Sequence, residues 1–189
     1  MISTKRVTLK KITLITIAAV SFFAAGQVFA HGPVRQKAEE DITINAPAEK
    51  VWAIIKNYDD MSWLPSVKST TADKGNKKGS LRVLTLQNGG TITEELKKYD
   101  EQKMTYAYKI TDMSIAKTIT HSGAEEQVPV LPVDNYAASI EVEANGATSV
   151  VAWKSAYYRA YMNNNPPEEM NEEAANTAVT GVLKSGLAN

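Results

Sequence analysis

Apolar and polar residues alternate over several short stretches of the chain, which is typical of strands with one face buried in a sheet. Turn residues such as Asn88-Gly89-Gly90 and Asn145-Gly146 separate them. Because most stretches follow one another closely, they predict an antiparallel meander of hairpins. The predicted strands are residues 37–44, 67–72, 80–87, 91–99, 104–110, 136–143 and 148–158.

Two segments show helical spacing instead. The first covers residues 47–57, with Pro47 at the first helical position. Its apolar stripe is Val51, Trp52, Ile54, Ile55 and Tyr58. The second covers residues 167–184, with Asn165 as the predicted N-cap. Its predicted buried stripe is Met170, Ala174, Thr177 or Ala178, Gly181 and Val182.

The order strand, helix, run of strands, long helix predicts an α+β domain. We expect a curved antiparallel sheet wrapped around the C-terminal helix. A three-residue loop at residues 88–90 keeps the apolar residues of the central hairpin on one face, together with Arg82 and Glu94. The pairs expected to lie opposite each other are Leu86 with Ile92, Leu84 with Glu94, and Arg82 with Leu96.

Residues 112–133 have no clean period and contain Gly123, Pro129 and Pro132. Connections in compact domains are usually shorter than this segment. We therefore predict an irregular loop that acts as a lid or binds a partner.

The N-terminal segment has the order of a secretory signal peptide. Four basic residues precede an apolar run at residues 12–25, and Val28-Phe29-Ala30 is a small-residue cleavage site. A retained membrane anchor is disfavoured, because a spanning helix needs about 20 apolar residues. We predict a signal peptide at residues 1–30 and a single domain at residues 31–189, exported to the periplasm and not stably inserted in a membrane.

Cleavage would remove four of the 21 basic residues and none of the 21 acidic ones, which leaves a net charge near −4. Nucleic acid is therefore not an expected partner. The chain has no cysteine, which excludes disulfides, thiolate catalysis and cysteine metal sites. Cleavage would give His31 a free α-amine beside its imidazole, and these two groups together can chelate copper. His121 could be a further ligand, but histidines far apart in the sequence are more often solvated. We expect no metal, no cofactor and no catalytic residue.

Several separated motifs carry a resemblance to a known superfamily. They are N-A-P-A-E-K-V-W at residues 45–52, S-W-L-P at 62–65, the hairpin at 82–96, L-P-V-D-N-Y at 131–136 and V-A-W-K-S-A-Y-Y at 151–158. Together they resemble the START-like, or SRPBCC, superfamily over residues 31–186. Within it the chain is most similar to the MxaD type of accessory protein in methanol oxidation. The resemblance implies a helix-grip fold.

The predicted inner face of the sheet carries the candidate site. Arg82 and Glu94 could receive an anionic or polar ligand group, or they could form a structural ion pair. The aromatic residues could line a pocket or only fill the core. They are Tyr106, Tyr108, Tyr136, Trp153 and Tyr157. Trp63, beside Pro65, could lie at a pocket rim, face a partner or cover the core.

Three functions compete. As the resemblance implies, the protein could be a non-catalytic accessory that contacts methanol dehydrogenase or its c-type cytochrome. Acidic runs such as residues 168–169 and 172–173 could assist such weak encounters, or could simply be solvated. It could also be a carrier of a hydrophobic small molecule, or a cyclase-like enzyme working in the same cavity. The last two need a cavity with a convergent polar group, and the enzyme also needs a shifted pKa.

Overall fold

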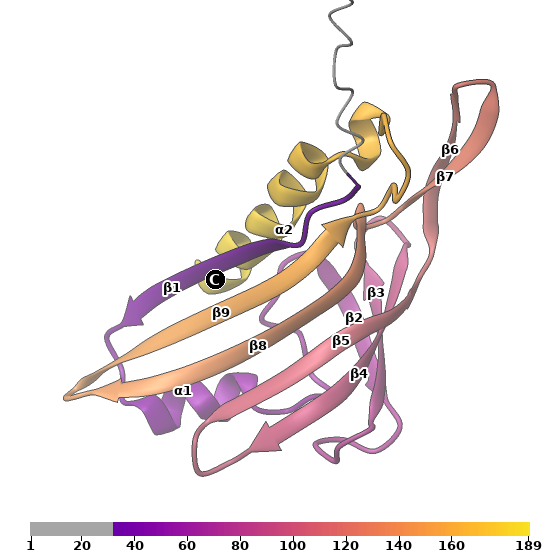
Figure 1. Ribbon diagram of the computed structural model, residues 1–189. Helices are drawn as coiled ribbons and strands as arrows, with labels where there is room; N and C mark the ends of the chain where they lie inside the picture. The colour runs from indigo at the N-terminus through magenta and orange to yellow at the C-terminus, as the bar shows by residue number, and fades with distance from the viewer. Residues whose placement is uncertain (1–31) are drawn as a thin grey trace, which may run out of the picture.

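The computed structural model describes residues 32–189 (Figure 1). The predicted signal peptide, its cleavage site and His31 lie outside these residues. The helices are α1 (Ala48–Ile55), the short 3-10 helix η1 (Glu168–Met170) and α2 (Glu172–Leu187). None of the helices in this range is long and apolar enough to cross a membrane. The strands are β1 (Gln36–Ile44), β2 (Val67–Ala72), β3 (Leu81–Leu86), β4 (Thr91–Asp100), β5 (Thr105–Met113), β6 (Ile115–His121), β7 (Ala124–Pro129), β8 (Val133–Asn145) and β9 (Thr148–Arg159).

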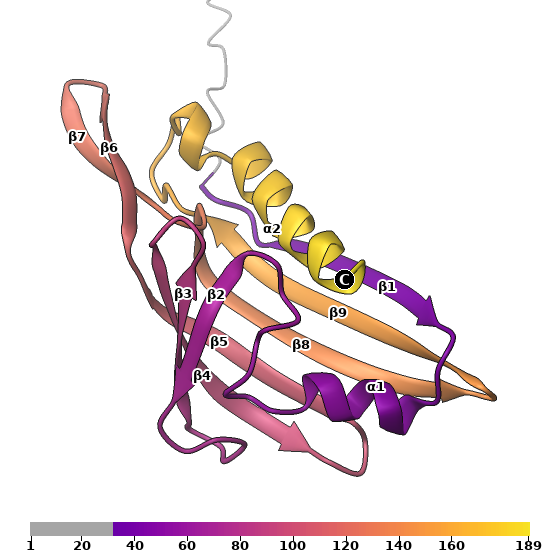
Figure 2. The ribbon, with the colours of Figure 1, turned by 180° about the vertical axis from the view of Figure 1, so that it is seen from behind.

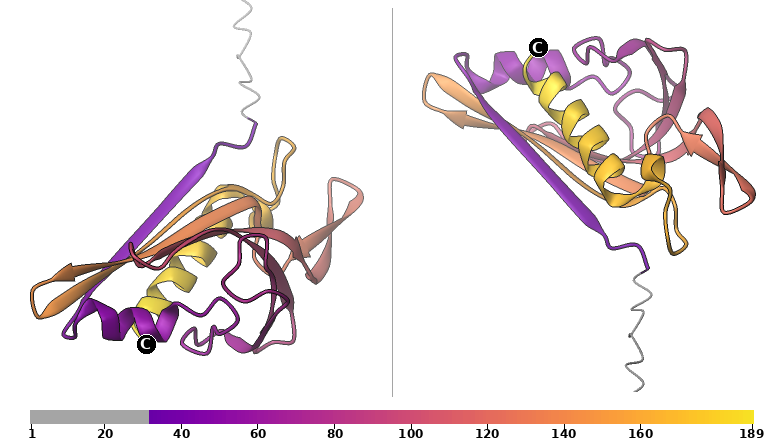
Figure 3. Two further views of the ribbon diagram at one scale, coloured as in Figure 1. Left: turned by 90° about the horizontal axis from the view of Figure 1, so that it is seen from below. Right: turned by 90° about the horizontal axis from the view of Figure 1, so that it is seen from above.

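Seven strands form one antiparallel sheet in the order β1-β9-β8-β5-β4-β3-β2. Figure 2 shows the sheet curling at the β2–β4 end, while α2 runs over its inner face along β1 and β9. Figure 3 shows α1 near one end of α2 and the β6–β7 hairpin beyond the other. The predicted α+β class and the curved sheet around a C-terminal helix are confirmed.

Alternation along the strands separates a buried inner face from a more polar outer face, as antiparallel sheets allow. On β8, Tyr136, Ile140 and Val142 are buried, and on β9 Val151 and Trp153 are buried. Helix α1 contacts both strands and α2 contacts β9, so the core and any internal cavity lie on this concave side.

The central hairpin has the predicted faces but a different register. Arg82 lies directly opposite Glu94, and Leu84 opposite Ile92, which is a shift of two residues from the predicted pairs. The loop is residues 87–90, with a turn in which the Gly89 amide donates to the Leu86 carbonyl at 3.0 Å. Gly89 has φ +86°, which suits glycine. A two-residue shift keeps every side chain on its face, and so the hydrophobic pattern could not detect it.

Helix α1 is shorter than predicted. It begins at Ala48, with Pro47 in extended conformation at the N-cap, and ends at Ile55. Three predicted stripe residues on it are buried, but Ile54 is 62 % exposed. The helix packs on the core along a narrow face, because it lies at the end of the sheet (Figure 2). The prediction of a buried Ile54 was therefore wrong.

The C-terminal helix begins later than predicted. Asn171, not Asn165, is the N-cap, and its side chain accepts a hydrogen bond from the Ala174 amide at 2.8 Å. Asn165 and Pro166 each precede a proline, which disfavours helical backbone at both positions. The predicted stripe was wrong in part, because Gly181 is exposed. Of its other members, Met170 is buried, and Ala174, Ala178 and Val182 are half-buried. The buried residues of α2 are Ala175, Val179, Leu183 and Gly186.

The segment predicted as an irregular loop is a β-hairpin. Strands β6 and β7 pair with each other and project from the body (Figure 1). Ser122 and Gly123 form the two-residue turn with φ +52° and +81°, as a type I′ turn requires. Lys117 pairs with Glu169 at 3.0 Å, which ties the hairpin to η1. The weak apolar pattern of this exposed hairpin explains why its strands were missed.

Candidate functional site

A buried ion pair lies at the centre of the curled part of the sheet. Arg82 Nε donates to Glu94 Oε2 at 2.5 Å, and the two residues are 0 % and 4 % exposed. The guanidinium lies over the rings of Tyr58 and Tyr108, 4.1 and 4.7 Å from their centroids. Arg82 Nη1 also donates to the Tyr58 carbonyl at 3.3 Å. Pairing, hydrogen bonding and cation–π contacts together compensate for burying the charge.

Burial controls the protonation of this cluster. It raises the pKa of the Glu94 carboxyl above its ordinary value, while the charge and hydrogen bond of Arg82 oppose part of the increase. Burial also raises the pKa of Tyr108 and Tyr136. Both phenols therefore stay protonated near neutral pH and can donate hydrogen bonds.

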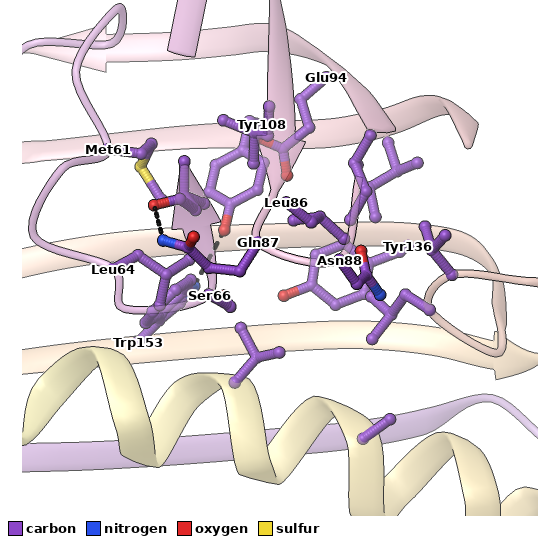
Figure 4. Close-up of a pocket in the computed structure, with 18 residues that line it drawn as sticks. Met61, Leu64, Ser66, Leu86, Gln87, Asn88, Glu94, Tyr108, Tyr136 and Trp153 are labelled. Carbon is purple, nitrogen blue, oxygen red and sulfur yellow. Dashed lines mark hydrogen bonds between the residues drawn. The ribbon is translucent and has the colours of Figure 1, made fainter. Parts of the chain in front are cut away.

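A cavity of about 330 Å³, here called cavity 1, opens beside this ion pair. Figure 4 shows the side chains around it, with Glu94, Tyr108 and Tyr136 pointing into the enclosed space. Its walls are mostly aliphatic and aromatic. The lining residues are Met61, Leu64, Ser66, Val67, Leu84, Leu86, Gln87, Asn88, Ile92, Glu94, Tyr108, Ile110, Val130, Leu131, Tyr136, Trp153, Ala178 and Val182.

The polar groups of cavity 1 are held in place by neighbours. The Trp153 indole N–H donates to the Tyr108 hydroxyl at 3.1 Å. The ring of Tyr136 stacks on Tyr157 with centroids 6.0 Å apart, and the Tyr157 hydroxyl donates to Asn176 of α2 at 2.9 Å. A positioned carboxylate and two positioned hydroxyls on an otherwise apolar wall can orient a small ligand.

The structure divides the predicted site residues into groups. Glu94, Tyr108, Tyr136 and Trp153 line cavity 1. Arg82, Tyr106 and Tyr157 are buried behind them and support the wall. Trp63 lies on a different wall and meets Trp153 edge to face, with centroids 5.5 Å apart. Their roles in ligand binding stay predictions.

Trp63 belongs to a second cavity of about 500 Å³, here called cavity 2. It lies between α1, the last turn of α2 and the adjoining ends of the sheet strands. Trp153 contributes to both cavities. The lining residues are Ile44, Ala46, Lys50, Val51, Ile54, Ile55, Trp63, Ile140, Val151, Trp153, Gly186, Leu187 and Asn189.

Sequence reasoning did not identify the rim of cavity 1 or any of cavity 2 except the two tryptophans. The rim of cavity 1 carries Ser66, Gln87 and Asn88. Ala178 and Val182 close it from α2, and their spacing of four places them on one helix face. Both residues belong to the predicted inward stripe of the C-terminal helix, but the sequence did not indicate that they close a cavity.

No metal centre is visible in residues 32–189. No group of three or more histidine, cysteine, aspartate or glutamate side chains comes together there. His121 Nε2 lies 2.7 Å from the Asn165 carbonyl, and its ring packs against Tyr161. The hypothesis that His31 and His121 share a metal remains outside the described residues.

The acidic runs are partly neutralised within the chain. Lys154 pairs with Glu39 at 2.8 Å and Lys184 with Glu40 at 3.7 Å. Arg159 pairs with Glu172, and Glu169 is held by Lys117 as described above. Less free acidic charge is therefore available for a partner than the sequence predicts.

Comparison with known proteins places the chain in a family. Residues 35–189 match the family described as polyketide cyclase / dehydrase and lipid transport. No curated protein sequence matches the chain.

Solved structures share the fold. XoxI from Bacillus cereus has a TM-score of 0.62 at 24% identity, covering 80% of this chain and 90% of its own. Norcoclaurine synthase from Thalictrum flavum, solved with dopamine and hydroxybenzaldehyde, has a TM-score of 0.53 at 14% identity, covering 94% and 91%. The ginseng major latex-like protein 151 from Panax ginseng has a TM-score of 0.54 at 13% identity, covering 82% and 96%. The chain therefore belongs to the polyketide cyclase / dehydrase and lipid transport family.

Proposed function

We propose that the protein binds a small, largely apolar molecule in cavity 1. The observation that carries this proposal is a cavity of about 330 Å³ with aromatic and aliphatic walls and one buried carboxylate. Ligand pockets usually have a volume of this order and a few positioned polar groups. The family's association with lipid transport and cyclase chemistry supports the same reading.

The polar groups define the ligand class. Glu94 accepts hydrogen bonds, and the Tyr136 hydroxyl can donate or accept one. A flat apolar molecule with one hydroxyl group could satisfy both while its rings lie against Tyr108 and Trp153. Arg82 already holds one carboxylate oxygen of Glu94 at 2.5 Å, which favours a binding role for that carboxylate over proton abstraction.

Fluorescence titration with 2-naphthol tests this proposal. We expect binding by the wild type and at least a tenfold loss in Ala178→Phe, because the new ring would occupy cavity 1 from α2. Thr177→Phe is the matched control, since Thr177 is exposed on the same helix and does not line the cavity. Equal affinity in the two variants, or no binding by the wild type, would reject cavity 1 as the site.

A second proposal concerns the biological setting. Following the sequence resemblance, the protein could act in the periplasm as an accessory of methanol oxidation, in contact with methanol dehydrogenase or its c-type cytochrome. The motifs along residues 45–158 and the predicted signal peptide support it. In this role the protein has no turnover of its own.

Reconstituted methanol dehydrogenase and its cytochrome provide the test. We expect the protein to raise the rate of electron transfer between them, and the gain to shrink with ionic strength if charge guides the encounter. An unchanged rate at low salt, together with retained binding of 2-naphthol, would reject the accessory role and leave the binding role intact.

A further inference from the structure

Cavity 2 is a separate apolar chamber at the far side of Trp153. Strands β1, β8 and β9 contribute Ile44, Ile140 and Val151, α1 contributes Val51, and α2 contributes Leu187. Its volume of about 500 Å³ exceeds that of cavity 1 and falls within the range of small-molecule sites. The chamber is therefore large enough to hold an alkyl chain.

A tight contact separates the two cavities. Trp63 and Trp153 meet edge to face, and the last turn of α2 presses on both rings at Gly186. A Cβ atom at Gly186 would lie 2.7 Å from Trp153 and 2.9 Å from Leu64. Because glycine permits this close approach, the tryptophan pair forms a wall, and a ligand in one cavity need not enter the other.

The opening of cavity 2 combines an exposed apolar residue with one basic side chain. Ile54 lines the cavity and is 62 % exposed, which is unusual for a large aliphatic side chain. Lys50, one helical turn earlier, is the only charged side chain among its lining residues in the described part of the chain. No side-chain carboxylate within residues 32–189 lies within 4.0 Å of its ammonium group, whereas Lys56, at the C-cap of the same helix, is paired with Glu101 at 3.1 Å.

We infer that cavity 2 binds an anionic amphiphile, with its alkyl chain among the apolar residues and its carboxylate on Lys50. Burying the alkyl chain against the apolar walls gives a favourable binding free energy in proportion to the apolar area removed from water. The ammonium group at the rim attracts the head group while both remain partly hydrated, so neither charge has to be buried. A fatty acid has this chemistry. The inference is independent of any ligand in cavity 1.

Isothermal titration calorimetry of the protein with decanoate, below its micelle concentration, tests the inference. We expect Lys50→Gln to weaken decanoate binding about threefold to fivefold, the effect of losing one exposed ion pair. Lys56→Gln is the matched control, since it removes the same charge from a residue that does not line the cavity. Decanol, which has no charge, should bind the wild type and Lys50→Gln equally.

A filling variant locates the site. Ala46→Phe places a ring in cavity 2 and should abolish decanoate binding, whereas Ala178→Phe fills cavity 1 and should leave it unchanged. Loss of binding in Ala178→Phe alone would place the amphiphile in cavity 1 and overturn the inference, as would a wild type that binds no decanoate. If Ala46→Phe fails to fold by circular dichroism, equal affinities in Lys50→Gln and Lys56→Gln would still overturn it.

Discussion

The two cavities on either side of Trp153 handle charge in opposite ways. Cavity 1 contains Glu94, which is 4 % exposed and pairs with a buried arginine that lies over tyrosine rings. Cavity 2 has a single lysine at its rim, left in water and unpaired in the described residues. A charge inside a core needs a compensating network, whereas a charge at a solvated opening needs none. The two sites should therefore respond differently to substitution.

The largest difference concerns the buried pair. Arg82→Met should lower the free energy of unfolding by about 3 to 5 kcal/mol, because it leaves Glu94 buried without its partner. Lys50→Met should change it by less than about 0.5 kcal/mol, as is usual at exposed sites. Urea unfolding measures both.

The double variant Arg82→Met/Glu94→Leu separates charge from packing. Replacing a buried ion pair by apolar residues is often neutral or stabilising, so we expect a stability near that of the wild type. A double variant as unstable as Arg82→Met would show that the pair contributes net stability, and the contrast with Lys50 would then rest on packing.

The wall between the cavities gives the next largest effect. Gly186→Ala should cost about 1 to 3 kcal/mol, since the added Cβ overlaps Trp153 and Leu64. Gly181→Ala on the same helix meets nothing within 4 Å and should gain about 0.5 to 1 kcal/mol from helix propensity. Thermal unfolding compares the two variants. A gain in stability in both would show that Trp153 and Leu64 shift to accommodate the added Cβ at little cost.

The pH dependence distinguishes the buried carboxylate from exposed ones. Because burial raises the pKa of folded Glu94 above the unfolded value of 4.5, the folded state binds its proton more tightly. The stability of the wild type relative to Glu94→Gln should be highest below pH 4.5 and fall as pH rises through the folded pKa. Exposed acids such as Asp60 have a lowered pKa, so their contribution to stability is lost as the pH falls. This contribution is the same in the wild type and in Glu94→Gln, and it cancels when the two stabilities are subtracted. A difference that rises with pH would mean that Arg82 dominates the pKa of Glu94.

The smallest effect concerns ligand selectivity in cavity 1. Tyr136→Phe should weaken 2-naphthol binding about fivefold and leave 2-methylnaphthalene unchanged, because it removes one hydrogen bond of about 1 kcal/mol. Tyr161→Phe, outside the cavity, is the control. Equal losses for both naphthalenes would indicate that Tyr136 shapes the wall and does not recognise the hydroxyl.

Much of the fold followed from local patterns. Alternation along β3 and β4 placed Arg82 and Glu94 on the inner face, and the structure confirms that face. The same pattern could not distinguish registers two residues apart, since both keep the faces. The direct opposition of Arg82 and Glu94 depends on the turn at Gly89 and on the contact of Arg82 with Tyr58, which lies 24 residues earlier in the chain.

Other errors arose where local signals conflicted or were weak. A proline at position 166 suggested a helix start, but two successive prolines delayed it to Glu172 and shifted the buried stripe. The β6–β7 hairpin has little apolar alternation, because it projects from the core and buries few of its side chains.

Local sequence patterns predict the seven strands of the main sheet, its two faces, the presence of both long helices and the aromatic inner wall, because backbone preference and hydrophobic period act over a few residues. The folded structure alone brings Trp63 against Trp153, packs Gly186 on both rings and leaves a cavity on each side of them. Those features depend on side chains from α1, α2 and distant strands arriving at one place, and no local period encodes the space left between them.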